Sequence, residues 1–313
     1  MKAGSYLDRL TESGEFRWEK LVIRGVDNTP LTNLLEAMVE GEVSLFHGEV
    51  SCGDEYVEIF HHFIEQAMVE RRPGPVARFA DGEYAFYRES LHCNGLYRQA
   101  ESKAAIRRAM PFHRKALKTL SRKGKIAAVI YPGNIQRKKR RFPFFQKPKG
   151  DDGALKFLDF LSGSGIALTG NNFLPFFVVY AYLTSKRFSR LVDGRNICIV
   201  NSEFDGAACG RWFSRHSSNP HMAFSPIPDS YMATQWPAIR EEVLASIPPE
   251  TDICLVGAGV GALLICVDAA EHLSIPAIDA GHVLNMMNGM EAKSGGPRLY
   301  TIHKEVRIRA DET

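Results

Sequence analysis

The sequence has no apolar run long enough to cross a membrane. A membrane-spanning helix needs about 20 apolar residues, whereas the longest candidate, Phe173–Leu183, is shorter and contains Pro175. The first residues are soon followed by charged side chains without an apolar segment between them, which is unlike a secretory signal. We therefore expect a soluble cytoplasmic protein, and we leave open a peripheral position at a membrane.

The common signatures of zinc sites, disulfides and several enzyme classes are also missing. There is no Cys-x-x-Cys pair, P-loop, serine-hydrolase elbow or His-Glu-x-x-His motif. The net charge of +3 is too small to indicate nucleic-acid binding by itself. We expect all six cysteines to be reduced thiols, and we expect no zinc site. The cysteines are Cys52, Cys93, Cys198, Cys209, Cys254 and Cys266, of which Cys198, Cys254 and Cys266 lie in apolar runs.

The 313 residues, 45% of them hydrophobic, are enough to enclose a large core. Short apolar runs that end in polar turns alternate with helical patterns, which favours an α/β fold with a mostly parallel sheet and helices on both faces. The predicted strands are 76–79, 125–131, 196–200, 252–256 and 275–279, with shorter extended segments at 166–169 and 224–228. The predicted helices are 31–39, 56–69, 84–91, 102–120, 152–161, 173–183, 207–213, 236–247 and one from the glycine run at 257–262 to about 272. We expect residues 1–54 to form an N-terminal extension packed on a main domain, 55–313.

Two carboxylates follow the first predicted strand, which ends near Arg78. Asp81 and Glu83 are separated only by Gly82, and an extended or turning backbone would aim both at one point. Such oxygen ligands suit Mg²⁺ or Mn²⁺, which in turn suits a substrate diphosphate. The alternative is an exposed Asp-Gly turn solvated by water.

A glycine run follows the strand at 252–256. The sequence from Gly257 through Gly259 to Ala262 fits G-x-G-x-x-G/A, and Asp279 lies at the end of the next strand. This spacing is that of a dinucleotide-binding loop, and it also resembles the loop of enzymes that bind S-adenosylmethionine. Only 34 residues follow Asp279, too few for a second mononucleotide-binding half. We therefore favour close approach to a ligand phosphate or tight helix packing, and keep a Rossmann enzyme with NAD(P) or S-adenosylmethionine as the alternative.

Polar residues follow two further strands. Asn201 and Ser202 precede a predicted helix, where small polar groups can meet a phosphate. Asp205 and Glu203 are candidates for a general base, with helix capping as the alternative role. His282 follows the last strand, where it is either a third metal ligand, a partner for phosphate or simply hydrogen-bonded.

Basic residues are interleaved with aromatic ones at 137–149. A solvated loop is one interpretation. Contact with an anionic acceptor or membrane surface is another. Binding of single-stranded nucleic acid by charge and stacking is the third, which would make the chain a non-enzymatic RNA- or surface-binding protein.

Taken in order, these motifs resemble the glycosyltransferases of the GT-D fold. The family signature Arg-Phe-Gly-Asp-Gly-Glu corresponds to 78–83 here, with Ala80 in place of glycine, and its Asp-x-Gly-His corresponds to 279–282. The stretch 193–196 and the Ile227-Pro228 pair also fit the family. The resemblance covers roughly 55–290. It departs at 257–260, where family members have a Gly-Pro-Thr-Ala-like turn, and it does not extend to the basic run.

The resemblance implies a Rossmann-like domain and a metal-dependent transfer of sugar from a nucleotide-diphosphate donor to an acceptor hydroxyl. We expect a nucleotide-sugar donor, with a UDP-sugar favoured, and a glycan or a glycosylated protein or lipid as acceptor. Asp81 and Glu83 would serve the metal (Mn²⁺ or Mg²⁺) and the donor, with His282 close to them and Asp205 a weaker candidate base. The residues expected at the donor are Arg78, Gly82, Asn201, Ser202, Gly257, Gly259 and Asp279.

Overall fold

The computed structural model describes residues 51–95, 97–130, 152–169, 171–214 and 217–289. The helix predicted at 31–39, most of the expected N-terminal extension and the basic run at 137–149 lie outside these residues. Within them, no helix combines the length and apolar character needed to span a membrane.

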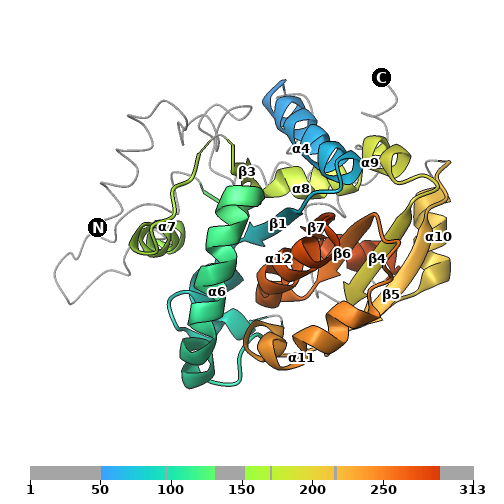
Figure 1. The fold of residues 1–313 in the computed structure, drawn as a ribbon. Coiled ribbons are helices and arrows are strands. Elements are labelled where there is room, and N and C mark those ends of the chain that lie inside the picture. Colours follow the sequence, from blue (N-terminus) through green and yellow to red (C-terminus); the bar gives the residue numbers. More distant parts are fainter. Residues whose placement is uncertain (1–50, 96, 131–151, 170, 215–216, 290–313) are drawn as a thin grey trace, which may run out of the picture.

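The core of the fold is a seven-stranded sheet in which every strand pair is parallel (Figure 1). The strand order is β3-β2-β1-β7-β6-β4-β5. The strands are β1 Gly74–Phe79, β2 Lys125–Ala128, β3 Phe173–Pro175, β4 Asn196–Asn201, β5 His221–Pro226, β6 Ile253–Gly257 and β7 Pro276–Asp279. The predicted α/β, Rossmann-like fold with a parallel sheet is confirmed.

Two apolar clusters cover the two faces of this sheet. Successive residues of one strand point to opposite faces, so Cys198 belongs to the first cluster and Ile199 to the second. The first cluster takes side chains from α5 Asp81–Phe86, α6 Lys103–Lys123, α7 Gly153–Gly163, α11 Met232–Ser246 and α12 Ala262–Leu273. The second takes them from α4 Ser51–Val69, α8 Phe176–Leu183, α9 Lys186–Leu191, α10 Gly206–Ser214 and α13 His282–Met287. Helices therefore cover both faces, as predicted (Figure 1).

Five cysteines in the described part of the chain are buried and free, as expected for reduced thiols: Cys93, Cys198, Cys209, Cys254 and Cys266. Two shorter predictions differ from the structure. The segment 166–169 forms no strand, because a turn closed by the Phe173 N–H to Thr169 carbonyl bond follows it. The helix predicted at 173–183 begins instead with β3, since this stretch pairs with β2 up to Pro175.

The strand order creates a switch in direction between β4 and β6. The chain leaves β4 toward the edge strand β5, whereas it leaves β6 toward β7 on the other side. Ligands of open parallel sheets bind outside the carboxyl ends of the strands at such a point. The polar residues selected from the sequence follow β1, β4, β6 and β7, and therefore belong to this one edge.

Candidate functional site

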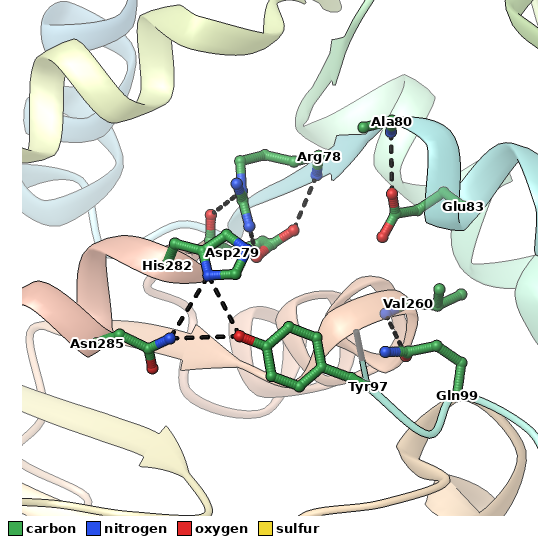
Figure 2. Close-up of polar contacts among 9 residues, drawn as sticks. All are labelled: Arg78, Ala80, Glu83, Tyr97, Gln99, Val260, Asp279, His282 and Asn285. Carbon is green, nitrogen blue, oxygen red and sulfur yellow. Dashed lines mark hydrogen bonds and ion pairs between the residues drawn. The ribbon is translucent and has the colours of Figure 1, made fainter. Parts of the chain in front are cut away.

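Arg78 and Asp279 join the carboxyl ends of β1 and β7 (Figure 2). The Asp279 carboxylate accepts hydrogen bonds from the Arg78 backbone N–H at 3.2 Å and from its Nη2 at 2.8 Å. Arg78 Nε donates to the Asp279 carbonyl at 2.8 Å. The side chains are only 8% and 3% exposed. This buried pair fixes two central strands at the edge where the candidate residues gather.

The guanidinium of Arg78 is enclosed by aromatic rings and by a glycine. Its carbon lies 4.7 Å from the Tyr180 ring centre and 5.1 Å from that of Phe176, within the range of cation–π attraction. Burial lowers the pKa of Arg78, but the Asp279 carboxylate, Tyr180 and Glu83 together outweigh it, and the net direction is upward. Gly281 has φ of 43°, and a Cβ there would lie 1.7 Å from Arg78 Nη2. Gly281 thus gives Arg78 the room to reach Asp279.

Glu83 lies in the first turn of α5 and folds back to its start. Its Oε2 accepts the Ala80 N–H at 2.9 Å, one half of a capping box. Burial raises the pKa of Glu83 to about 7, opposed by the Ala80 hydrogen bond. A carboxyl group with such a pKa beside a buried charged pair is typical of functional sites, although structural networks produce it too.

Asp81 and Glu83 follow β1 as predicted, but the expectation that an extended or turning backbone aims both carboxylates at one point is wrong, because both belong to helix α5. Residues two apart on a helix do not face each other, and Asp81 is exposed while Glu83 is partly buried. Gly82 has open space around its missing side chain. No group of three His, Cys, Asp or Glu side chains in the described part of the chain is placed to hold a metal ion. Asp81, Glu83 and His282 therefore form no metal site built from protein ligands alone.

The glycine run is occupied by the protein itself. Gln99, which is 6% exposed, accepts the Val260 N–H through Oε1 at 2.9 Å (Figure 2). A Cβ on Gly259, whose φ is +53°, would lie 2.5 Å from the Gln99 amide. A Cβ on Gly257 would lie 2.9 Å from the Asn201 side-chain oxygen. One backbone donor of the loop thus already has a protein acceptor.

Gly261, the next glycine of the motif, packs against the start of helix α11. A Cβ on Gly261 would lie 2.6 Å from Cβ of Met232 and 2.9 Å from the backbone nitrogen of Ala233, in the first turn of α11. Gly259 therefore makes room for the Gln99 side chain, Gly257 for Asn201 at the end of β4, and Gly261 for the first turn of α11. Tight packing was one of the two interpretations favoured from the sequence, and it accounts for all three positions.

Asp279 also differs from the acidic residue of a dinucleotide site. It does lie at the end of β7, next to β6, as the motif requires. However, its carboxylate oxygens both accept hydrogen bonds from Arg78, and it is only 2% exposed. It has no exposed oxygen surface to offer a ribose hydroxyl, which counts against the NAD(P) alternative.

The polar residues that follow β4 form hydrogen bonds in the loop that leads to α10. Asp205 Oδ1 accepts the Ala208 N–H at 2.9 Å, so Asp205 caps α10. Asn201 is buried and donates to the Glu203 carbonyl, and Asn288 donates to the same carbonyl. Ser202 is exposed at the surface. The capping role that we weighed for Asp205 is therefore present, and Asp205 lies apart from the contacts of Arg78 and Glu83.

His282 lies next to two residues that the sequence analysis did not select. The Tyr97 hydroxyl is 3.3 Å from His282 Nδ1, and Asn285 Nδ2 donates to the same hydroxyl at 3.3 Å (Figure 2). Tyr97 and Gln99 were missed because they occupy an irregular segment without periodicity. Asn285 was detectable by its spacing, since residues three apart share a helix face.

Comparison with known proteins supports the resemblance noted from the sequence. Residues 162–287 match the family model of the GT-D fold-like domain. One solved structure, described as a highly conserved domain of unknown function (1792) with a distinct glycosyltransferase fold, is 15% identical to this chain. The aligned region covers 79% of this chain and 83% of the chain in that structure, with a TM-score of 0.44. None of the curated proteins compared with the chain matches it.

The fold and the edge described above define an α/β protein of the Rossmann-like class. More particularly, residues 162–287 are similar to the GT-D fold-like domain, in agreement with the resemblance found in the sequence. The matched residues run from the end of α7 to α13 and include Asp279 and His282, whereas Arg78 and Glu83 precede them. The buried pair between Arg78 and Asp279 connects the two parts.

Proposed function

We propose that the protein is a glycosyltransferase that moves a sugar from a nucleotide-diphosphate donor to an acceptor hydroxyl. The observation that carries this proposal is the GT-D-like domain, whose last strand brings Asp279 and His282 to the same edge as Arg78 and Glu83. Charged groups at the carboxyl edge of a parallel sheet suit a phosphorylated ligand.

Each charged group has a distinct part in this proposal. Glycosyl transfer places negative charge on the leaving diphosphate and requires a proton to leave the acceptor hydroxyl. Arg78 contributes positive charge near the edge and holds β1 against β7, so it acts mainly as a positioning residue. Glu83 is the carboxyl group of choice for contact with donor or acceptor. One of its oxygens caps α5, but its raised pKa and its position near Arg78 and Asp279 distinguish it from Asp205, which caps α10, and Asp279 is committed to Arg78.

A divalent cation, Mn²⁺ or Mg²⁺, belongs to the proposal as well. Mg²⁺ is commonly held by one or two carboxylates together with substrate phosphates. Because Asp81 and Glu83 point apart on α5, only one of them, Glu83 at the sheet edge, would supply such a carboxylate, and no three-ligand protein site is present among the described residues. When bound, the ion would stabilise charge on the leaving diphosphate. Excess chelator would then abolish transfer and added Mn²⁺ would restore it.

The alternative functions have less support. The Gln99 amide fills the glycine turn, and Asp279 is paired with Arg78, so the two features that suggested NAD(P) or S-adenosylmethionine are both occupied. The basic run proposed for nucleic acid or a membrane surface lies outside the described residues. We therefore retain these alternatives only as control ligands in the test.

The proposal is tested by measuring binding and turnover of nucleotide-sugars. The wild-type chain is titrated with UDP-, GDP- and dTDP-sugars in the presence of Mn²⁺, with NAD and S-adenosylmethionine in parallel. Glu83→Gln retains an acceptor for the Ala80 N–H and removes the charge, whereas Glu242→Gln neutralises an exposed glutamate on α11 as the matched control. We expect metal-dependent hydrolysis or transfer that only Glu83→Gln abolishes. Binding of NAD or S-adenosylmethionine, with no response to any nucleotide-sugar, would reverse the proposal.

A further inference from the structure

The side chain of Asn94 is hydrogen-bonded to the backbone of Gln99 and Ala100. Asn94 Oδ1 accepts the backbone N–H groups of Gln99 at 2.7 Å and Ala100 at 3.0 Å. Asn94 Nδ2 donates to the Ala100 carbonyl at 2.8 Å. Three hydrogen bonds from one amide thus fix Asn94 relative to Gln99 and Ala100, the two residues at the other end of the segment 94–100.

The same segment is also attached to two elements of the sheet edge. Gln99 Oε1 accepts the Val260 N–H in the glycine turn that follows β6, as described above. The Arg98 carbonyl accepts the Tyr231 N–H at 2.7 Å, directly before α11. Arg98 and Gln99, the two residues that follow Tyr97, are thus held by contacts with residues far away in the sequence.

Tyr97 directly precedes these two attached residues and combines an exposed side chain with a hydrogen-bonded hydroxyl. The side chain is 39% exposed, and its hydroxyl contacts His282 and Asn285 on α13 (Figure 2). Its ring centre is 5.7 Å from that of the His282 imidazole. A single exposed apolar side chain is common on protein surfaces. Tyr97 is distinguished by the hydrogen bonds that hold its hydroxyl against α13.

The surroundings of Tyr97 place this ring at the candidate site. His282 follows Gly281, which packs against Arg78, and Arg78 is paired with Asp279. The other exposed large apolar side chains of the described residues are Ile59 and Val69 on α4, Leu91 before this segment and Phe112 on α6. Tyr97 is the one among them that is hydrogen-bonded to the helix following Asp279.

We propose that Tyr97, anchored by His282 and Asn285, is a stacking platform for a ring of the nucleotide-sugar donor. This assignment rests on the proposed function and adds a binding residue to it. Stacking on a held aromatic ring tolerates different ring chemistries, because it uses the face of the ring rather than its edge. Asn285 and His282 supply polar groups beside the platform for the edge of the same ligand.

A nucleotide-sugar carries two rings, the nucleobase and the sugar, and the binding assay separates them. Calorimetric titration with UDP alone reports on the nucleobase, and titration with UDP-glucose reports on both. Equal weakening for both ligands in a Tyr97 variant assigns the platform to the base. Weakening for UDP-glucose only assigns it to the sugar. The GDP and GDP-mannose pair is used in the same way if the wild-type chain prefers guanine.

Three variants test the platform itself. Tyr97→Ala removes the ring, and we expect affinity to fall about 5- to 150-fold, the range for loss of one aromatic stacking contact. Tyr97→Phe keeps the ring and loses the hydroxyl, and we expect a loss of about two- to threefold from a looser ring. Phe112→Ala removes an exposed aromatic ring on α6 as the control and should leave affinity unchanged. Thermal melting of each variant establishes that it is folded.

The outcomes separate failure of the platform from failure of the function. Wild-type binding that Tyr97→Ala leaves unchanged overturns the platform and leaves the glycosyltransferase proposal standing. A loss in Tyr97→Phe as large as in Tyr97→Ala also overturns it, because the hydroxyl and not the ring would then matter. A wild-type chain that binds no nucleotide or nucleotide-sugar overturns both proposals together.

Discussion

Removal of the Asp279 carboxylate should strongly destabilise the fold. In Asp279→Ala, the guanidinium of Arg78 would remain between Phe176 and Tyr180, with only its Nε bond to the residue 279 carbonyl. Two hydrogen bonds to the carboxylate, at 2.8 and 3.2 Å, would be lost. The variant therefore leaves a buried positive charge without its counter-ion.

The expected cost is about 3–5 kcal/mol, the range for removing one partner of a buried ion pair. Hydrogen bonds to charged groups contribute about 1.5–3 kcal/mol each, so two such bonds give a similar figure. Replacing both partners should cost much less than the sum of the two single variants, because no buried charge remains. Arg78→Met and the double variant Arg78→Met with Asp279→Ala complete the cycle.

Urea unfolding followed by circular dichroism measures these differences, with thermal melting as a second probe. The matched control is Glu271→Ala, which breaks the exposed Lys123–Glu271 pair at 2.8 Å, where the side chains are 50% and 40% exposed. That variant should cost about 0–1 kcal/mol. A cost below about 1 kcal/mol for Asp279→Ala would refute our account, as would a double variant that is no more stable than the two single changes predict.

Three further predictions follow from the same edge of the sheet. Because the pKa of Glu83 is 4.5 in its ordinary state and about 7 in the folded protein, ionising Glu83 costs the folded state free energy. The stability of the fold should therefore decrease as the pH rises from about 4.5 to about 7. Glu83→Gln keeps the Ala80 cap, and its melting temperature relative to wild type should therefore be higher at pH 8 than at pH 5; equal differences at both pH values would contradict this. Gly281→Ala should lower the melting temperature by as much as a core defect, since its Cβ would overlap Arg78, whereas Gly82→Ala, in open space, should not. Gln99→Ala frees the Val260 N–H of the glycine turn, and calorimetry should detect tighter pyrophosphate binding by this variant than by wild type; equal affinity would contradict this.

The sheet was predictable because its strands are short apolar runs with clear ends. The strand predicted at 196–200 lies within β4, and that at 252–256 differs from β6 by one residue at each end. Such runs are continuous in apolar character because both faces of a parallel sheet are buried. The position of Asp279 at the carboxyl edge followed from the same pattern, since all strands share one direction.

The site was less predictable because local hydrogen bonds decided it. Nothing in the spacing of Asp81 and Glu83 distinguishes an extended turn from the first turn of a helix, and the Ala80 N–H to Glu83 bond favours the helix. The glycine run satisfied a phosphate-binding pattern, but Gln99, 161 residues away from Val260 in sequence, fills it. Such long-range contacts leave no signal in the local pattern, so the same glycines serve packing where the motif alone suggests a ligand.

The place of β7 in the sheet has a consequence for how the chain folds as it is made. β7 is the last strand in the described sequence, yet it lies between β1 and β6. Until it is synthesised, β3-β2-β1 and β6-β4-β5 are two separate three-stranded ribbons, each with a long open edge. Domains emerge from their N-terminal end during synthesis, so β3-β2-β1 and β6-β4-β5 cannot be joined into one sheet until β7, the last strand of the described residues, has been made. The Arg78–Asp279 pair can form only in that same step, when β7 joins the two halves of the sheet.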